Sequence, residues 1–271
     1  MGNNYVGRVD PTDQMWKSSP WTDLLKHRYF ISSLFCKNKV VLDSCCGTGW
    51  GTMKYIVPFA RFTVGFDLCK TAAETYKQFD NYWFGVMDAR DFGLKNSIFD
   101  LVLCLDSLEH LTDEDGVKYL SEMSRVCKED GHIIGTTPLV IDDCLIPKYL
   151  EWNKYHLCMY TRRSLKKALR IFFSSVAIYE IYNKVSPYFL FICGKSAVGL
   201  NKKMERKMEQ FVLEKKREII EVRMCNYLSW AKTLISERKY FKAGYLFCAV
   251  FVMKLGLFWN ERYDYSVNKR F

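Results

Sequence analysis

The sequence has few of the features that mark export or covalent cross-linking. Its eleven cysteines form no CxxC pair, and most of them lie in apolar runs such as FDLVLCL at 99–105. This pattern is typical of buried free thiols in a reducing compartment and speaks against a disulfide framework. The first residues, MGNNYVGRVD, lack the basic and then apolar composition of a signal peptide. We therefore expect a cytoplasmic protein.

Long hydrophobic runs are also missing. The most apolar stretch, AGYLFCAVFVM at 243–253, is shorter than the about 20 residues that a membrane span requires. The chain has no internal repeat, and its hydrophobic fraction of 49% and aromatic fraction of 16% are those of a folded protein. A length of 271 residues favours one large domain, or one domain with an appendage.

Positive charge is concentrated near the C-terminus. Residues 201–271 hold 16 Lys and Arg against 8 Asp and Glu, which accounts for +8 of the net charge of +10. From Phe211 to Ile235 apolar residues recur at helical spacing, and a second helix is expected from about Phe241 to Phe258. We expect this basic extension to dock on the core or to pair between the subunits of a homodimer. Its basic face is a solvated surface or a guide for an anionic acceptor.

Apolar runs alternate with helical periods from Val40 onward, which is typical of βα units and a mostly parallel sheet. The last two strands read as a closing antiparallel pair. Helices are expected at 21–35, after the glycine turn through Val57, and at 71–79, 113–127 and 161–170. The seven strands are expected at 39–43, 61–67, 82–88, 99–105, 131–138, 174–182 and 186–194.

These elements predict an α/β fold, in which helices cover both faces of a Rossmann-like, seven-stranded sheet. Residues 1–34 would form an N-terminal helical cap, 35–195 the core and 201–271 a C-terminal helical extension. The segment GKSAVGLNKK at 194–203 is the best candidate for a linker.

A glycine turn follows the first predicted strand. VVLDSCCGTGWG places Gly47, Gly49 and Gly51 where missing side chains let the backbone pass close to a ligand at a helix N-terminus. The spacing GxGxG resembles motif I of class I S-adenosylmethionine-dependent methyltransferases, (V/L)LDxGCGxG. Cys45 stands where that family usually has its first glycine, which is tolerable if its φ angle stays negative.

Further stretches match the same family in order, namely VGFDLC, GVMDARDF, FDLVLCLDSLEHL and RVCKEDGHIIGTTP, so that the resemblance covers about 160 residues. The resemblance is closest to ubiquinone-biosynthesis, sugar and polyketide O-methyltransferases. It implies that Asp67 binds the ribose of S-adenosylmethionine and that Asp88 and Ala89 bind the adenine. RVCKEDGHIIGTTP resembles the family's next helix and fifth strand. The full set of cofactor residues implied is Asp43, Cys45, Gly47, Gly49, Asp67, Leu68, Asp88, Ala89 and Leu105.

His110 follows the fourth strand, where this fold opens its acceptor pocket, and an imidazole can take a proton from a hydroxyl near neutral pH. It is the candidate catalytic base, or else a histidine of the pocket wall. DSLEH also resembles the ExxEH metal site of small-RNA 2'-O-methyltransferases and of some ubiquinone O-methyltransferases. We expect no functional metal; if one binds, its ligands would be Asp106, Glu109, His110 and His156.

His27, Arg28 and Tyr29 in KHRYF resemble an element that closes over the cofactor in sugar and lipid methyltransferases, and His156 is a second candidate for the acceptor site. An amphipathic helix explains KHRYF nearly as well. The resemblance implies methyl transfer to an oxygen, or less favourably a nitrogen, of a small-molecule or glycan acceptor, with S-adenosylhomocysteine as product. The alternatives are an RNA methyltransferase, with nucleic acid as a less favoured partner, and a non-catalytic cofactor-binding subunit.

Overall fold

The computed structural model describes residues 14, 16–68, 79–182, 185–196, 205–215, 217 and 228. Its central sheet has the strand order β3-β2-β1-β4-β5-β8-β7, with β6 paired to the end of β5. The first five strands pair in parallel, and β8 is antiparallel to both β5 and β7. The strands are β1 Val40–Ser44, β2 Phe62–Asp67, β3 Tyr82–Val86, β4 Phe99–Leu105, β5 Cys127–Val140, β6 Tyr160–Thr161, β7 Ser175–Ile181 and β8 Tyr188–Gly194.

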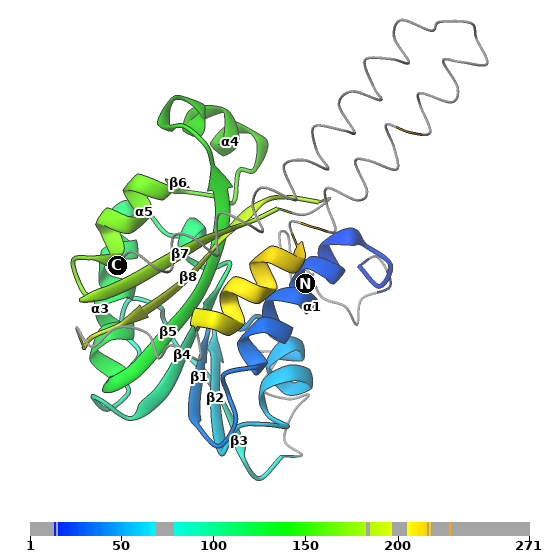
Figure 1. Ribbon diagram of the computed structural model, residues 1–271. Helices are drawn as coiled ribbons and strands as arrows, with labels where there is room; N and C mark the ends of the chain where they lie inside the picture. The colour runs from blue at the N-terminus through cyan, green and yellow to red at the C-terminus, as the bar shows by residue number, and fades with distance from the viewer. Residues whose placement is uncertain are drawn as a thin grey trace, which may run out of the picture. The chain divides into compact units, whose positions relative to one another are not determined.

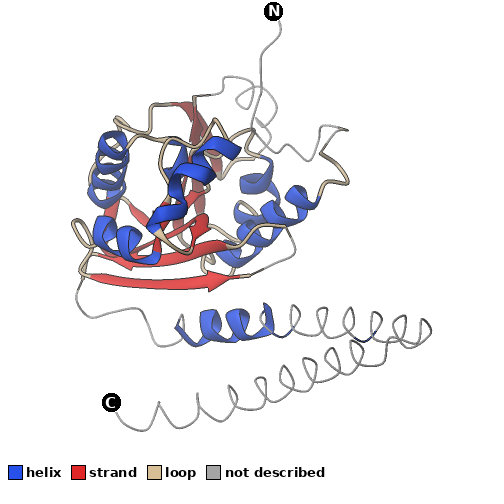
Figure 2. Ribbon diagram, turned by 90° about the horizontal axis from the view of Figure 1, so that it is seen from above, coloured by secondary structure: helices blue, strands red, loops and turns tan. Residues whose placement is uncertain are grey.

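Helices lie on both faces of the sheet, so the predicted Rossmann-like α/β fold is confirmed (Figures 1 and 2). The helix α1 and the short η1 lie on one side, and α3 and α5 lie on the other (Figure 1). Because both faces are covered, β4 and β8 read as almost continuous apolar runs, and most of their side chains are fully buried. The helices are α1 Pro20–Ser33, η1 Thr52–Ile56, η2 Leu108–His110, α3 Asp113–Val126, η3 Asp143–Leu145, α4 Ile146–Trp152 and α5 Arg162–Leu169.

All seven expected strands are present, and the antiparallel closing pair is confirmed as β7 and β8. The structure adds the two-residue β6, and it extends β5 beyond its expected ends to Cys127–Val140. It also adds α4, in which no residue is buried. The helix expected at 71–79 lies outside the described residues except for Phe79.

The expected buried thiols are confirmed among the described cysteines, all eight of which are free. Cys45 is intermediate and Cys144 is exposed. The other six, Cys36, Cys46, Cys104, Cys127, Cys158 and Cys193, are buried.

The chain divides into two compact units, residues 1–181 with 185–206 and residues 182–184 with 207–271. Around the start of the second unit, residues 205–215 are helical, with Met208 and Phe211 buried and Arg206 and Lys207 exposed. The remaining apolar stripe and the helix expected at 241–258 lie outside the described residues, except for Leu228. Among the helices described, none is long and apolar enough to cross a bilayer.

Candidate functional site

The strand order reverses between β1 and β4, and in open α/β sheets ligands bind beyond the carboxyl ends of the strands at such a point. Three features of the sequence meet at this edge of the sheet. The glycine turn follows β1, Asp67 is the last residue of β2, and Asp106 follows β4. The topology therefore gathers the sequence candidates at one edge, as expected from their positions at strand ends.

The glycine turn and Asp67 are in direct contact. The backbone N–H of Gly47 donates a hydrogen bond of 2.8 Å to Oδ2 of Asp67, whose exposed fraction is only 5%. Gly47 and Gly49 have φ angles of +63° and +73°, a region that side chains rarely adopt. A Cβ atom at Gly47 would meet no other atom within 4 Å. The turn therefore requires glycine at 47 for its backbone conformation and leaves open space beside it.

Cys45 contradicts one expectation from the sequence, since its φ angle is +56° and not negative. The turn needs the left-handed conformation here, and the next amide, of Cys46, is held by a 3.0 Å hydrogen bond to the carbonyl of Phe66. A residue other than glycine in this conformation costs about 1 to 2 kcal/mol. The turn thus holds a left-handed residue at position 45 although no glycine stands there, and burial raises the pKa of the Cys45 thiol.

Gly51 also departs from the expectation that all three glycines leave room for a ligand. A Cβ atom at Gly51 would lie 2.1 Å from Cε2 of Tyr29, a buried side chain of α1. The Tyr29 ring stacks on Tyr55, with ring centroids 6.4 Å apart. The space at Gly51 is therefore filled by the protein itself, and this glycine serves the packing of α1 on the turn.

Asp43 is a fully buried carboxylate directly before the turn. Burial raises the pKa of Asp43 to about 7, although hydrogen bonds from Thr52 and Tyr29 favour its charged form. Thr52 donates to Oδ2 of Asp43 over 2.5 Å, while Oδ1 has no hydrogen-bond partner among the described residues. Buried polar atoms normally have a partner, so an unpaired acceptor here fits a ligand that carries a donor or a positive charge.

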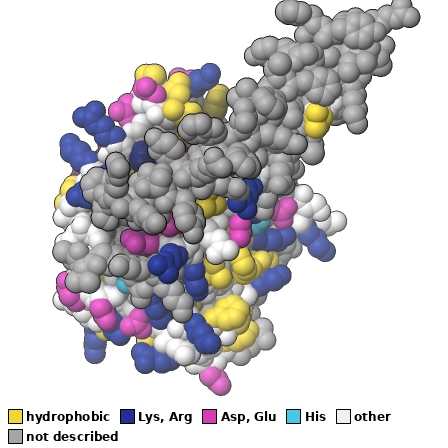
Figure 3. Space-filling model, viewed as in Figure 1, with side chains coloured by type: hydrophobic (Ala, Val, Ile, Leu, Met, Phe, Trp, Pro, Cys, Tyr) yellow, Lys and Arg dark blue, Asp and Glu magenta, His cyan; other side chains and the backbone are white. Residues whose placement is uncertain are grey.

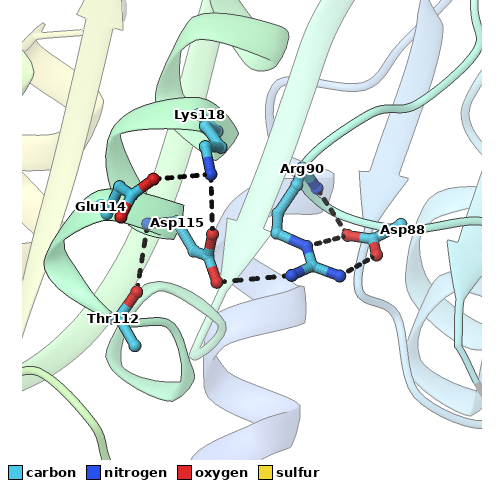
Figure 4. A network of polar contacts seen from close by, with 6 residues as sticks. All are labelled: Asp88, Arg90, Thr112, Glu114, Asp115 and Lys118. Carbon is cyan, nitrogen blue, oxygen red and sulfur yellow. Dashed lines mark hydrogen bonds and ion pairs between the residues drawn. The ribbon is translucent and has the colours of Figure 1, made fainter.

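Asp88 lies in a polar network on the surface (Figure 4). Its carboxylate accepts hydrogen bonds from the backbone and the guanidinium of Arg90, and these lower the pKa of Asp88 to about 2. Arg90 also lies 3.6 Å from Asp115 of α3. Both carboxylate oxygens of Asp88 thus already face a cation, and a ligand amine would share them with Arg90. Of the other expected cofactor residues, Ala89 and Leu105 are buried, and Leu68 is 64% exposed.

The three consecutive residues of α1 that were expected to close over the cofactor, His27, Arg28 and Tyr29, differ in their burial. His27 is exposed, whereas Arg28 and Tyr29 are buried. The Arg28 guanidinium forms an ion pair with Asp106 and lies 4.9 Å from the ring centroid of Tyr188. Burial lowers the pKa of Arg28 to about 10. Arg28 and Tyr29 therefore join α1 to the strand ends that carry the site.

Glu109, His110 and His156 form a cluster in which one potential ligand atom from each lies within 4.8 Å of the others. The two imidazole rings meet edge to face, with centroids 5.1 Å apart. Glu109 is buried, accepts a 3.1 Å hydrogen bond from Thr137 and has its pKa raised to about 7 by burial. Asp106 instead accepts from Thr136 and pairs with Arg28. The structure thus brings three of the four conditional metal ligands together.

Both histidines are held by the chain that follows α4. Nδ1 of His110 lies 2.8 Å from the carbonyl oxygen of Tyr155, which can only accept, so the neutral His110 ring carries its proton on Nδ1. Nε2 of His156 lies 2.9 Å from the side-chain nitrogen of Asn153. Burial, and next the neighbouring His110, lower the pKa of His156 to about 4. The exposed His110 therefore has its lone pair on Nε2.

Sequence reasoning missed the residues that hold the predicted ones in place. Thr136 and Thr137 of β5 bind the two acids, and they carry a signal, because hydroxyl groups are unusual inside a buried apolar strand. Tyr155 acts through its backbone carbonyl, which any residue could supply, so its type gives no signal.

Comparison with known proteins agrees with this fold. Residues 41–131 match the family model described as "Methyltransferase domain". No curated protein matches the chain. Three similar solved structures, with 15 to 19% sequence identity, share the fold. These are YcgJ of Bacillus subtilis (15% identity, TM-score 0.53, covering 63% of this chain and 99% of that one), PH0226 of Pyrococcus horikoshii (19%, 0.52, 69% and 97%) and the N-methyltransferase NodS of Bradyrhizobium japonicum with S-adenosylhomocysteine (15%, 0.52, 70% and 94%).

Proposed function

We propose that this chain, whose residues 41–131 match a methyltransferase domain, is a class I S-adenosylmethionine-dependent methyltransferase. It methylates an oxygen of a small-molecule or carbohydrate-like acceptor, with His110 as general base. Methylation of nitrogen is the less favoured form of the same proposal. The observation that supports His110 is its hydrogen bond to the carbonyl of Tyr155, because it fixes the tautomer in which Nε2 is the basic nitrogen.

The residues at the strand ends fit the cofactor. S-adenosylmethionine supplies an already activated methyl group on a sulfonium and also carries an ammonium group, so acidic side chains suit it. Asp43 has an unpaired buried oxygen, and Asp67 lies against the glycine turn. In this proposal Gly47, Gly49, Asp43 and Asp67 hold the amino acid and ribose portions. Asp88, Ala89, Leu68 and Leu105 surround the adenine, with Cys45 completing the turn.

Chemistry at the acceptor then depends on this chain's own groups. His110 takes the hydroxyl proton on Nε2 while the Tyr155 carbonyl stabilises the positive ring through Nδ1. Alignment of donor and acceptor supplies most of the remaining rate enhancement. We propose that no metal takes part, since the hydrogen bond from Asn153 uses the Nε2 lone pair of His156. A histidine binds a metal through the lone pair of a ring nitrogen, and the hydrogen bond already uses this one.

His110→Ala tests the base. We expect a loss of about 10²- to 10⁴-fold in rate with nearly unchanged affinity for S-adenosylhomocysteine. Turnover should continue in a chelator such as EDTA. These assays need an acceptor, whose class is identified beforehand. The protein is incubated with methyl-labelled cofactor and fractionated cell extract, and the fraction that takes up the label is determined. Activity lost in chelator and restored by magnesium or manganese would refute the metal-free proposal.

A second candidate function is RNA methylation, and the cluster of Glu109, His110 and His156 is the observation that favours it. The basic residues of 201–271 add electrostatic attraction for a polyanion. This candidate predicts that the label enters ribonuclease-sensitive material and that acceptor affinity falls steeply with salt. Label in small molecules or glycans, insensitive to ribonuclease, would eliminate it.

A further inference from the structure

The chain between β5 and β6 is apolar and exposed at the same time. We call residues 141–157 the α4 segment. It holds three of the most exposed large apolar side chains among the described residues, with exposed fractions of 76% for Ile141, 69% for Trp152 and 55% for Leu157. Neither η3 nor α4 has a buried residue, although α4 reads IPKYLEW. Hydrophobic side chains gather over α4 in the space-filling view (Figure 3). Exposed apolar surface of this kind marks an interaction site.

We propose that the α4 segment docks on a lipid surface. Two of its lysines lie against aromatic rings, an arrangement that suits the boundary between water and lipid. The Lys148 ammonium lies 5.2 Å from the ring centroid of Trp152, and the Lys154 ammonium lies 5.2 Å from that of Tyr155. Trp and Tyr rings settle at the level of lipid headgroups, while lysine can extend its ammonium toward phosphate. The core of a protein interface, by contrast, is depleted in lysine.

The charge around the segment agrees with this partner. Arg162, Arg163 and Lys166 of α5 line one hollow together with Ile141, so basic groups flank this end of the α4 segment. The same hollow is lined by Asp142 and Asp143, which offset part of that charge. Apolar insertion should therefore dominate, with a smaller contribution from anionic lipid.

The α4 segment is also tied to the candidate base. Besides the contacts of Tyr155 with His110 and of Asn153 with His156, the amide of Leu157 donates a 2.8 Å hydrogen bond to the carbonyl of Glu109. A protein docked through α4 would hold this site next to the lipid surface, where an acceptor with a lipid anchor arrives. The docking itself is independent of the role of His110 and of the acceptor's identity.

Co-sedimentation of the full chain with lipid vesicles tests the proposal. The vesicles are phosphatidylcholine alone and phosphatidylcholine mixed with phosphatidylglycerol. We expect binding to both, stronger to the mixture, and a loss of about ten-fold or more in Trp152→Ala, because a large aromatic side chain no longer leaves water. Ile141→Ser should weaken binding in the same direction. Phe59→Ala is the matched control, since Phe59 is 52% exposed in the turn before β2, at the opposite edge of the parallel strands.

Each other outcome overturns the proposal. Wild-type protein that stays in the supernatant with both vesicles has no lipid-docking surface. Binding only to anionic vesicles, equal in Trp152→Ala and Phe59→Ala, would assign the attraction to basic residues elsewhere, such as those of 201–271. Self-association that is lost in Trp152→Ala without vesicles would make the segment a protein interface. Binding of S-adenosylhomocysteine by calorimetry should be the same in all variants, so failure of docking remains distinguishable from failure of the methyltransferase proposal.

Discussion

Asp43 is a buried carboxyl group whose charge depends on what lies beside it. Burial holds its pKa at about 7, so near neutral pH a large fraction of the protein carries Asp43 in the protonated form. A cation placed against Oδ1 favours the carboxylate and lowers that pKa. Binding of a cationic ligand here must then release a proton.

This proton release makes the affinity for a cationic ligand depend on pH. Affinity for S-adenosylhomocysteine, which carries an ammonium group, should rise with pH through the range below about 7 and level off above it, because fewer protons remain to be displaced. Calorimetric titrations at several pH values measure this dependence, and in Asp43→Asn it should be flat. An unchanged slope in the variant would show that another group titrates.

Asp67 is the carboxylate proposed to bind the ribose. Asp67→Ala should weaken binding of S-adenosylhomocysteine, since hydrogen bonds to a charged group contribute about 1.5 to 3 kcal/mol each. Calorimetry against Asp80→Ala, an exposed acid removed from the site, separates this effect from a change in net charge. Equal affinities in the two variants, or selective binding of a nicotinamide dinucleotide, would count against the assignment of Asp67 to the ribose.

The sequence predicted which side chains lie at the site. It predicted less well the conformation and orientation of each of these residues. Asp67, Glu109 and His110 lie at the expected edge because β2 and β4 end there, whereas His156 joins Glu109 and His110 from the chain after α4. The sequence could not predict the φ angle of +56° at Cys45, since most cysteines avoid this region and only the shape of the turn requires it. Nor could it predict that Asp106 turns toward Arg28, a residue far away in the chain.

The helix α1 packs closely against the glycine turn because Gly51 has no side chain. The Tyr29 ring occupies the position of a Cβ at Gly51 and is held between the turn and Tyr55. The turn continues into the π-helix η1, where the amide of Val57 donates to the carbonyl of Thr52. Thr52 in turn donates to Asp43, so packing and the site share residues.

Gly51→Ala should therefore destabilise the protein by about 1 to 3 kcal/mol, as overpacking in a rigid core does. Thermal or denaturant unfolding measures the loss of stability. In a protein that already carries Tyr29→Ala, the further substitution Gly51→Ala should cost almost no additional stability. The matched control is Gly116→Ala inside α3, where the new Cβ would lie 3.4 Å from the Tyr160 hydroxyl and alanine favours the helix by about 0.5 to 1 kcal/mol. Equal stability of the two alanine variants would contradict the packing argument.

The sequence predicted an element where it is long enough to show a buried stripe or an apolar run, and missed elements that are very short or have no buried residue. The helix α3 has acidic residues in its first turn and a buried stripe, so its period was plain. The strand β6 has two residues and depends only on its pairing with the end of β5. No core-facing pattern exists in α4, because nothing in it is buried, and the rule of amphipathic spacing could not find it.

The sequence predicted a Rossmann-like, mostly parallel sheet, and the parallel pairing of β1 with both β2 and β4 agrees with it. The sequence carries this information because glycine turns and acids at strand ends mark which edge binds a ligand. It carries no comparable signal for the acceptor, because binding residues commonly lie on loops, which follow no periodic pattern.

Residues 201–271 should contribute to the stability of the protein. Their apolar stripe is too long to leave in water, so deletion of these residues should expose apolar surface and give an aggregated or less stable protein. Size-exclusion chromatography and thermal unfolding of the truncated chain measure both effects. A monodisperse truncation with full activity would show that the extension has no packing role.

The uneven burial of the cysteines determines where covalent reagents can attack. The thiolate is the reactive form, and burial raises the pKa of Cys36, Cys104 and Cys127 to about 12. Of the described cysteines only Cys144 is exposed, and it lies in η3, directly before α4. The neighbouring Asp142 raises its pKa as well, but leaves the sulfur accessible. Within the described part of the chain, a maleimide dye or a nitroxide should therefore attach at Cys144, and its signal would report on the surroundings of Trp152 without any engineered cysteine.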